Sequence, residues 1–193
     1  MDHAIACYIG KLLSQKKVID NKYEEVYVYG LELIISFISS VLLILVVAII
    51  TRQILSAIIF ISIYVFLRRV TGGYHANTHF KCKVCTLTIY SLHLLLTCIT
   101  TINLFEYLAF GIFGIIIILL FAPIANPNKP ILDKHKPRFK ILSLVIFVTL
   151  LIVGICFSFF SRSLSNSVFY TLLSVIVLMI MPKLKRRKKD ENS

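Results

Sequence analysis

The chain has 193 residues, of which 58% are hydrophobic, and its mean hydropathy is +0.88. A soluble domain of this size is usually about half apolar, so the composition argues against an ordinary soluble protein. The formal net charge is +12, but the basic residues stand between long apolar runs, which favours membrane topology over nucleic-acid binding.

The N-terminal segment, residues 1–29, is predicted to form an amphipathic helix. Its apolar residues recur at helical spacing, at Ile5, Tyr8, Ile9, Leu12 and Leu13. This pattern is typical of a helix that lies on the membrane surface, although a soluble cap packed on the rest of the protein would show it too. The segment is too polar for a secretory signal peptide, so we expect it to stay with the mature protein.

Six apolar segments follow, and each is a candidate transmembrane helix. They run approximately over 31–51, 53–67, 84–105, 107–122, 141–160 and 167–181. A helix that crosses the hydrocarbon core needs about 20 residues. The second segment falls short of this length between Arg52 and Arg68, so it either borrows flanking residues or crosses only part of the membrane. The third and fourth segments are nearly continuous and are separated only around Glu106.

The distribution of lysine and arginine predicts how these segments are oriented. All of these residues except Arg52 and Arg162 fall in the two termini and in the long loops 68–83 and 123–140. Basic connections stay in the cytoplasm, so we expect both termini and both long loops there. A four-span protein with one buried hairpin would give the same alternation, so the charges support the orientation more strongly than the number of spans.

Together these patterns predict an all-α, polytopic membrane protein with about six transmembrane helices. We expect three parts: the interfacial segment 1–29, a transmembrane domain over 30–182 and a basic cytoplasmic tail over 183–193. The tail is suited to anchor the topology and to contact anionic lipid.

A cysteine and a histidine in the loop 68–83 could form a thiol catalyst. A cysteine attacks as its thiolate, and a nearby imidazole can take the proton. His75 and Cys82 are seven residues apart. On an unbroken helix this separation is about 10 Å of rise, too far for a direct hydrogen bond. We therefore expect the chain to bend between them, and Gly72 and Gly73 permit unusual backbone angles just upstream.

The start of the third span would favour a thiolate. If Asn77 or Thr78 caps this helix, Cys82 lies in its first turns, where the helix dipole and two adjacent lysines stabilise negative charge. His75 would then lie in the loop and fold back onto the thiol. From the residues alone, Cys85 competes with Cys82 as the nucleophile.

The same stretch also has the residue types of a zinc site. His75, His79, Cys82 and Cys85 supply the nitrogen and sulfur ligands that zinc prefers. On one straight helix, however, they would spread over roughly ten residues, too far apart for one ion. In the simplest interpretation neither site exists, the histidines are interfacial polar residues and the cysteines serve packing.

The other long loop opens with a proline-rich stretch. Pro123, Pro127 and Pro130 forbid a regular helix and fix a stiff turn. Lys129 stands between rigid neighbours, so it either binds a carboxylate or carbonyl group or serves only as a cytoplasmic anchor.

Two polar residues, His93 and Asn103, fall within the predicted spans. His93 lies eleven residues after Cys82, roughly on the same helix face. An ionisable residue inside a membrane often marks a functional interior, but a histidine that packs between helices is the more common case.

Two motifs in the two long cytoplasmic loops belong together. The first is Arg68-Arg69, then Gly72-Gly73-Tyr74-His75-Ala76, then Cys82, and the second is Ala122-Pro123 with Lys129-Pro130. In order and spacing they resemble the signatures of the accessory gene regulator B family, and the resemblance covers nearly the full chain. It implies a bacterial plasma-membrane cysteine endopeptidase that cleaves a short quorum-sensing precursor peptide on its C-terminal side. It also implies that the enzyme helps to close a thiolactone or lactone ring in the cleaved peptide.

The resemblance assigns roles that the spacing alone left open. Cys82 matches the nucleophile and His75 its base, which chooses Cys82 over Cys85. Substrate-binding or supporting roles are expected for Arg69, Gly73, Asn77 and Lys129. The implied partners are the precursor peptide, membrane lipid and, as an option, a second copy of the chain, with no cofactor, metal or nucleic acid. A non-enzymatic exporter of the peptide is the rival interpretation.

Overall fold

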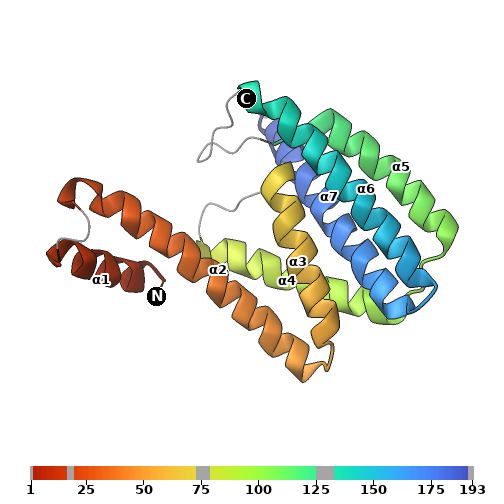
Figure 1. The fold of residues 1–193 in the computed structure, drawn as a ribbon, viewed down its shortest axis with the longest axis horizontal. Helices are drawn as coiled ribbons and strands as arrows, with labels where there is room; N and C mark the ends of the chain where they lie inside the picture. The colour runs from red at the N-terminus through yellow and green to blue at the C-terminus, as the bar shows by residue number, and fades with distance from the viewer. Residues whose placement is uncertain (1, 17–19, 73–78, 125–132, 191–193) are drawn as a thin grey trace. The chain divides into compact units, whose positions relative to one another are not determined.

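The computed structural model describes residues 2–16, 20–72, 79–124 and 133–190 (Figure 1). Seven α-helices occur in these residues: α1 (Asp2–Gln15), α2 (Glu24–Ile50), α3 (Ile54–Thr71), α4 (His79–Ile99), α5 (Leu104–Phe121), α6 (Lys136–Ser158) and α7 (Arg162–Asp190). Short 3-10 helices, η1 (Asn21–Tyr23) and η2 (Asp133–His135), precede α2 and α6. The described residues contain no strand, so the prediction of an all-α chain is confirmed.

Six of these helices, α2 to α7, are long and apolar enough to cross a membrane, as the sequence predicted. The doubtful second segment is an 18-residue helix, because α3 continues past Leu67 through Arg68 and Arg69 to Thr71. At about 1.5 Å per residue its length is about 27 Å, close to the thickness of a hydrocarbon core.

The break between α4 and α5 comes earlier than the sequence analysis placed it. α4 ends at Ile99, and Asn103 is the N-cap of α5. The Asn103 side chain accepts a hydrogen bond from the backbone N–H of Glu106 at 3.0 Å, and the Glu106 carboxylate accepts one from the N–H of Asn103 at 2.8 Å. This capping box satisfies two backbone donors at the helix start. Asn103 is therefore a helix cap, and the expectation that it is a polar residue within a span was wrong.

The chain divides into two compact units, which are described separately. The first comprises Met1–Val47 and Ala76–Leu87, and the second comprises Ala48–His75 and Thr88–Ser193. α2 and α4 each contribute to both units.

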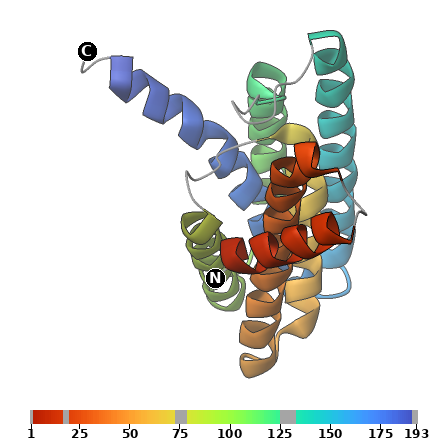
Figure 2. The same cartoon turned by 90° about the vertical axis from the view of Figure 1, so that its left-hand side faces the viewer.

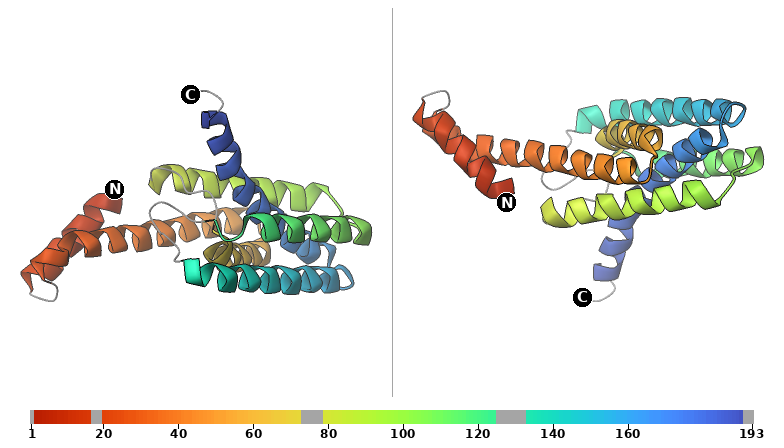
Figure 3. Two further views of the ribbon diagram at one scale, coloured as in Figure 1. Left: turned by 90° about the horizontal axis from the view of Figure 1, so that it is seen from above. Right: turned by 90° about the horizontal axis from the view of Figure 1, so that it is seen from below.

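In the first unit, α1 folds back along the first half of α2, as Figures 2 and 3 show. The two helices approach closely at Gly10, where an added Cβ atom would lie 2.4 Å from Val28 Cγ2. Ala6, one turn before Gly10, is fully buried. The predicted N-terminal helix is present, but it ends at Gln15, and the end of the segment 1–29 belongs to α2, which begins at Glu24. Its position at a membrane surface stays a prediction.

In the second unit, α3, α5, α6 and α7 pack against one another around α7, the most enclosed of the six spans. Small residues allow the close approach of α5 and α6. A Cβ atom on Gly114 would lie 2.3 Å from the Phe147 ring, and one on Gly111 would lie 3.0 Å from Leu151. Small residues at contacts between helices are typical of membrane proteins, where close van der Waals packing drives association.

Candidate active site

Cys82 lies at the start of α4. The helix begins at His79, so Cys82 is its fourth residue, and the prediction that it occupies the first turn is confirmed. The N–H groups of a first helical turn have no partner within the helix. Cys82 is half-buried and forms no disulfide, and its backbone carbonyl accepts a hydrogen bond from Thr86 Oγ1 at 3.0 Å.

Several predicted site residues lie outside the part of the chain that the structure describes. They are Gly73, His75, Asn77 and Lys129. The pairing of His75 with Cys82 and the roles of the other three therefore stay predictions. The predicted zinc site also needs His75 and His79. The structure describes neither His75 nor the side chain of His79, so this alternative stays a prediction too. The described residues alone contain no cluster of three or more His, Cys, Asp or Glu side chains suited to a metal ion.

The structure brings the two motif segments into contact at Thr71–Gly72 and Ile124. The backbone N–H of Ile124, after α5, donates a hydrogen bond to the carbonyl of Thr71, at the end of α3, at 2.9 Å. Gly72 and Ile124 form a parallel β-bridge. The two long loops therefore begin side by side, at Gly72 and Ile124. Sequence reasoning found the two motifs, but no spacing within either motif predicted this contact.

Gly72 makes the turn that the loop requires. It caps α3 with φ 71° and ψ −157°, and its N–H donates to the carbonyl of Arg68 at 3.0 Å. An added Cβ atom would lie 2.2 Å from the carbonyl oxygen of Ile124. Both the positive φ and the close contact call for glycine. The expected unusual backbone angle upstream of His75 is confirmed at Gly72.

Two arginines occupy the last turn of α3, where the negative end of the helix dipole favours cations. The Arg68 guanidinium lies over the Tyr64 ring, 5.1 Å from its centroid, and donates a hydrogen bond to the Tyr64 hydroxyl. Arg69 is exposed. Arg68 is thus held along its own helix, while Arg69, which the first motif singles out, is accessible to a bound molecule.

A buried polar cluster lies farther along α4. His93 is 1% exposed, and its Nε2 atom lies 3.1 Å from Ser56 Oγ on α3 and 3.2 Å from Ser167 Oγ on α7. The two serine oxygens are 2.8 Å apart. We call Ser56, His93 and Ser167 the serine–histidine cluster. The sequence analysis singled out His93 but missed both serines, because a serine in an apolar run carries no signal of what it contacts.

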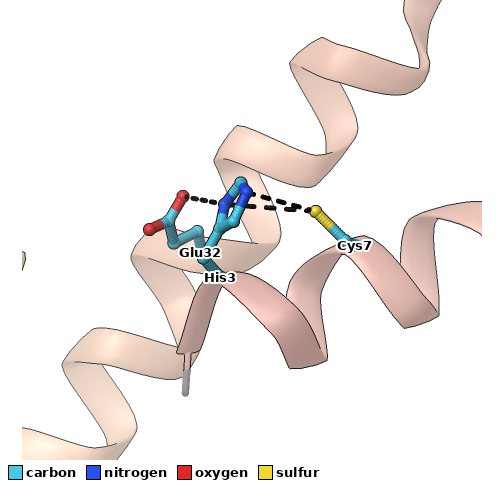
Figure 4. Close-up of polar contacts among 3 residues, drawn as sticks. All are labelled: His3, Cys7 and Glu32. Atoms are coloured by element: carbon cyan, nitrogen blue, oxygen red, sulfur yellow. Dashed lines mark hydrogen bonds and ion pairs between the residues drawn. The ribbon is translucent and has the colours of Figure 1, made fainter.

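The first unit contains a thiol–imidazole pair that was not predicted from the sequence. Figure 4 shows His3 on α1 between Glu32 on α2 and Cys7, one turn farther along α1. His3 Nδ1 lies 3.3 Å from Glu32 Oε2, and His3 Nε2 lies 3.5 Å from Cys7 Sγ. The His3 side chain is 71% exposed, so this contact adds little stability. The arrangement still offers a base to a thiol, which makes Cys7 a rival of Cys82.

The family model described as Accessory gene regulator B matches residues 5–182, a range that contains both motifs. The chain belongs to the accessory gene regulator B family. This membership confirms the resemblance inferred from the two motifs.

Individual members of the accessory gene regulator B family show moderate identity. Accessory gene regulator protein B of Staphylococcus epidermidis is 30% identical over 92 residues, which cover 48% of this chain and 47% of that protein. An AgrB-like protein of Clostridium beijerinckii is 28% identical over 152 residues, which cover 78% of this chain and 75% of that protein. The chain thus spans about half the length of the staphylococcal relative and three quarters of the clostridial one. No solved structure matches this chain.

Proposed function

We propose that this chain is a membrane-embedded cysteine endopeptidase that cleaves a short quorum-sensing precursor peptide on its C-terminal side. The observation that carries the proposal is the position of Cys82 in the first turn of α4, within a motif of the accessory gene regulator B family.

The proposed reaction begins when the His75 imidazole takes the proton of the Cys82 thiol. The thiolate attacks a carbonyl carbon of the precursor, the peptide C–N bond breaks, and the C-terminal fragment leaves as an amine that receives the proton from His75. The rest of the precursor is then bound to Cys82 as a thioester. A Cys or Ser side chain of the same peptide attacks this thioester, which closes a thiolactone or lactone ring and releases the Cys82 thiol.

Ring closure competes with hydrolysis of the thioester. Exchange of one thioester for another keeps most of the acyl activation, so this step requires no ATP. Attack by water would give a linear acid instead, so a productive site has to limit access of water. A site that holds both ends of the peptide gives the intramolecular attack a large effective concentration.

The supporting residues are proposed to hold the precursor. Arg69 is exposed at the end of α3, and Lys129 follows the contact between Gly72 and Ile124 in the sequence. These cations would bind acidic groups of the leaving segment. Gly73 would allow close approach of a peptide backbone, and Asn77 would orient the His75 imidazole.

We place the chain in the bacterial plasma membrane, with both termini and both motif loops in the cytoplasm. The six apolar helices and the basic connections between them support this orientation. An amphipathic precursor lying on the inner membrane surface would then reach Cys82, and membrane lipid would surround α2 to α7. A homodimer is compatible with this arrangement.

The proposal is tested by co-expressing the chain with its precursor and following cleavage by mass spectrometry. We expect Cys82→Ala and His75→Ala each to abolish cleavage, since the first removes the nucleophile and the second its base. Cys85→Ala and Cys7→Ala are the controls, and both should retain most of the activity. Cleavage that survives Cys82→Ala but disappears in Cys7→Ala would move the nucleophile to α1 and contradict the proposal.

The same experiment separates the rival functions. A peptide exporter would still deliver its cargo after Cys82→Ala, because transport needs no nucleophile. A zinc-dependent hydrolase would lose activity in the presence of a chelator and regain it with zinc. A cysteine peptidase should instead be inhibited by a thiol-alkylating reagent at Cys82 and should be insensitive to the chelator.

A further inference from the structure

α4 joins the second unit through polar and aromatic side chains on one face, whereas α3, α5, α6 and α7 pack more extensively against one another. The Phe60 ring of α3 lies 5.1 Å from the Tyr90 ring and 5.0 Å from the His93 ring. On another face, near the end of α4, Gln53 Nε2 donates a hydrogen bond to Cys98 Sγ at 2.8 Å. Hydrogen bonds have preferred directions, so contacts of this kind fix the rotation of a helix about its axis more strictly than apolar packing alone.

The serine–histidine cluster is the central contact of this face. His93 Nε2 meets both hydroxyls, while its Nδ1 atom is buried and has no hydrogen-bond partner among the described residues. A buried nitrogen without a partner is unfavourable for stability, and an apolar side chain of similar size would avoid this cost. Without His93, Ser56 and Ser167 would still bond each other at 2.8 Å. The histidine therefore specifies an arrangement more than it strengthens the fold.

Cys82 and His93 lie on nearly the same side of α4. α4 is continuous from His79 to Ile99, and the separation of eleven positions from Cys82 to His93 is just over three turns, an offset of about 20°. On this side of α4, Cys82, Thr86, Tyr90, His93 and Thr97 are half-buried or buried, while Lys83 and Leu87, which lie off this side, are half-buried as well.

We infer that His93 is a positioning residue for the reaction, because its bonds to Ser56 and Ser167 set the rotation of α4 and hence the direction in which the Cys82 thiol leaves the helix. This inference rests on the proposed function of Cys82. A shift of about 1 Å in a reacting group can reduce a rate by two orders of magnitude, so a small rotation of α4 is sufficient to affect the chemistry.

Two substitutions at His93 separate positioning from packing. His93→Phe keeps a ring beside Phe60 and Tyr90 but removes both bonds to the serines. His93→Gln restores a polar group near the place of Nε2. The matched control is Tyr107→Phe, which removes a buried 2.5 Å hydrogen bond from α5 to the carbonyl of Ser165 on α7 and involves no atom of α4.

The first measurement is steady-state cleavage of a synthetic precursor by the full chain in lipid vesicles, together with thermal unfolding. In His93→Phe we expect kcat to fall at least about tenfold while KM changes less than about twofold. We expect His93→Gln to recover kcat to within about threefold of the parent, and Tyr107→Phe to stay within about twofold. The unfolding midpoint of His93→Phe should be no lower than that of Tyr107→Phe. Unchanged kcat in His93→Phe, or a loss of kcat that follows a lower midpoint and is not recovered by glutamine, overturns the inference.

The second measurement uses no precursor and is therefore independent of the proposed function. It compares the labelling rates of Cys82 and Cys85 by a water-soluble maleimide in the folded chain. If His93 sets the rotation of α4, His93→Phe should change the ratio of the two rates by about threefold or more, while Tyr107→Phe should leave it unchanged. An unchanged ratio in His93→Phe overturns the inference, whereas cleavage that survives Cys82→Ala overturns only the proposed function.

Discussion

Gly72 is the residue at which the two motifs meet, and it can be tested directly. Gly72→Ala would force a positive φ on a side chain and place its Cβ 2.2 Å from the Ile124 carbonyl oxygen. We expect a loss of about 2 kcal/mol or more in the free energy of unfolding, because backbone strain and the clash add. Cleavage should fall at least about tenfold, because a shift of about 1 Å in a reacting group can reduce a rate by two orders of magnitude. The measurements are denaturant unfolding of the purified full chain and precursor cleavage.

The control for this change is Gly30→Ala on α2. A Cβ atom there would meet nothing within 4 Å, and alanine is the better helix former by about 1 kcal/mol. This variant should be as stable as the parent or more so. If Gly72→Ala behaved like Gly30→Ala in both measurements, the contact between the motif segments would have no role in the site.

Single residues also show how far sequence reasoning reaches. The place of Cys82 in a first helical turn was predictable, because candidate capping residues and two glycines precede it. The contact of Gly72 with Ile124 was not predictable, because the two residues are more than fifty positions apart and no pattern in the sequence pairs their segments. His3 and Cys7 stand four apart, which predicts contact on one helix face, but their partner Glu32 comes from another helix.

At the scale of elements, the docking of α1 on α2 depends on one close approach. Gly10→Leu would place a branched side chain where even a Cβ lies 2.4 Å from Val28, so α1 should separate from α2. A cross-link reports this change. In a background without the native cysteines, a short bis-maleimide reagent should join His3→Cys to Glu32→Cys, because the parent side chains meet at 3.3 Å. Adding Gly10→Leu should reduce the cross-linked fraction severalfold.

Gly30→Leu is the matched comparison for this cross-link, since it adds the same side chain to α2 at an open position. It should leave the yield unchanged. Equal yields in both leucine variants would mean that Gly10 does not determine how α1 docks.

Helix boundaries were the weaker part of the prediction at this scale. The apolar run that ends near Phe105 suggested that one span continued almost to Glu106, but α4 ends at Ile99. Asn103 followed three residues later by Glu106 is a readable capping signal, which the hydrophobic pattern concealed. Hydropathy reports which residues tolerate an apolar environment, whereas the start of a helix is decided by backbone hydrogen bonds.

At the scale of the whole molecule, hydropathy predicted the six apolar helices but not which of them is enclosed. The most apolar stretch of 18 residues lies in α2, and 17% of that stretch is buried within the protein. The corresponding stretch of α7 is less apolar, yet 67% of it is buried. Lipid and protein interiors accept the same apolar side chains, so hydropathy cannot distinguish them. The small and polar side chains of α7, such as Ser165, Asn166 and Ser167, are the better sign of a central helix.

The orientation of the whole chain gives the last prediction, and labelling of single cysteines in intact cells tests it. In a background without the native cysteines, an impermeant maleimide should label Thr51→Cys and Thr101→Cys, which lie in connections with few or no basic residues. Lys134→Cys, exposed in η2 within the basic loop 123–140, should react only after the cells are opened. Protection of Thr51→Cys in intact cells would indicate that α3 belongs to a buried hairpin, and labelling of Lys134→Cys would reverse the topology. The second result would place Cys82 on the outer face, where a cytoplasmic precursor could not reach it.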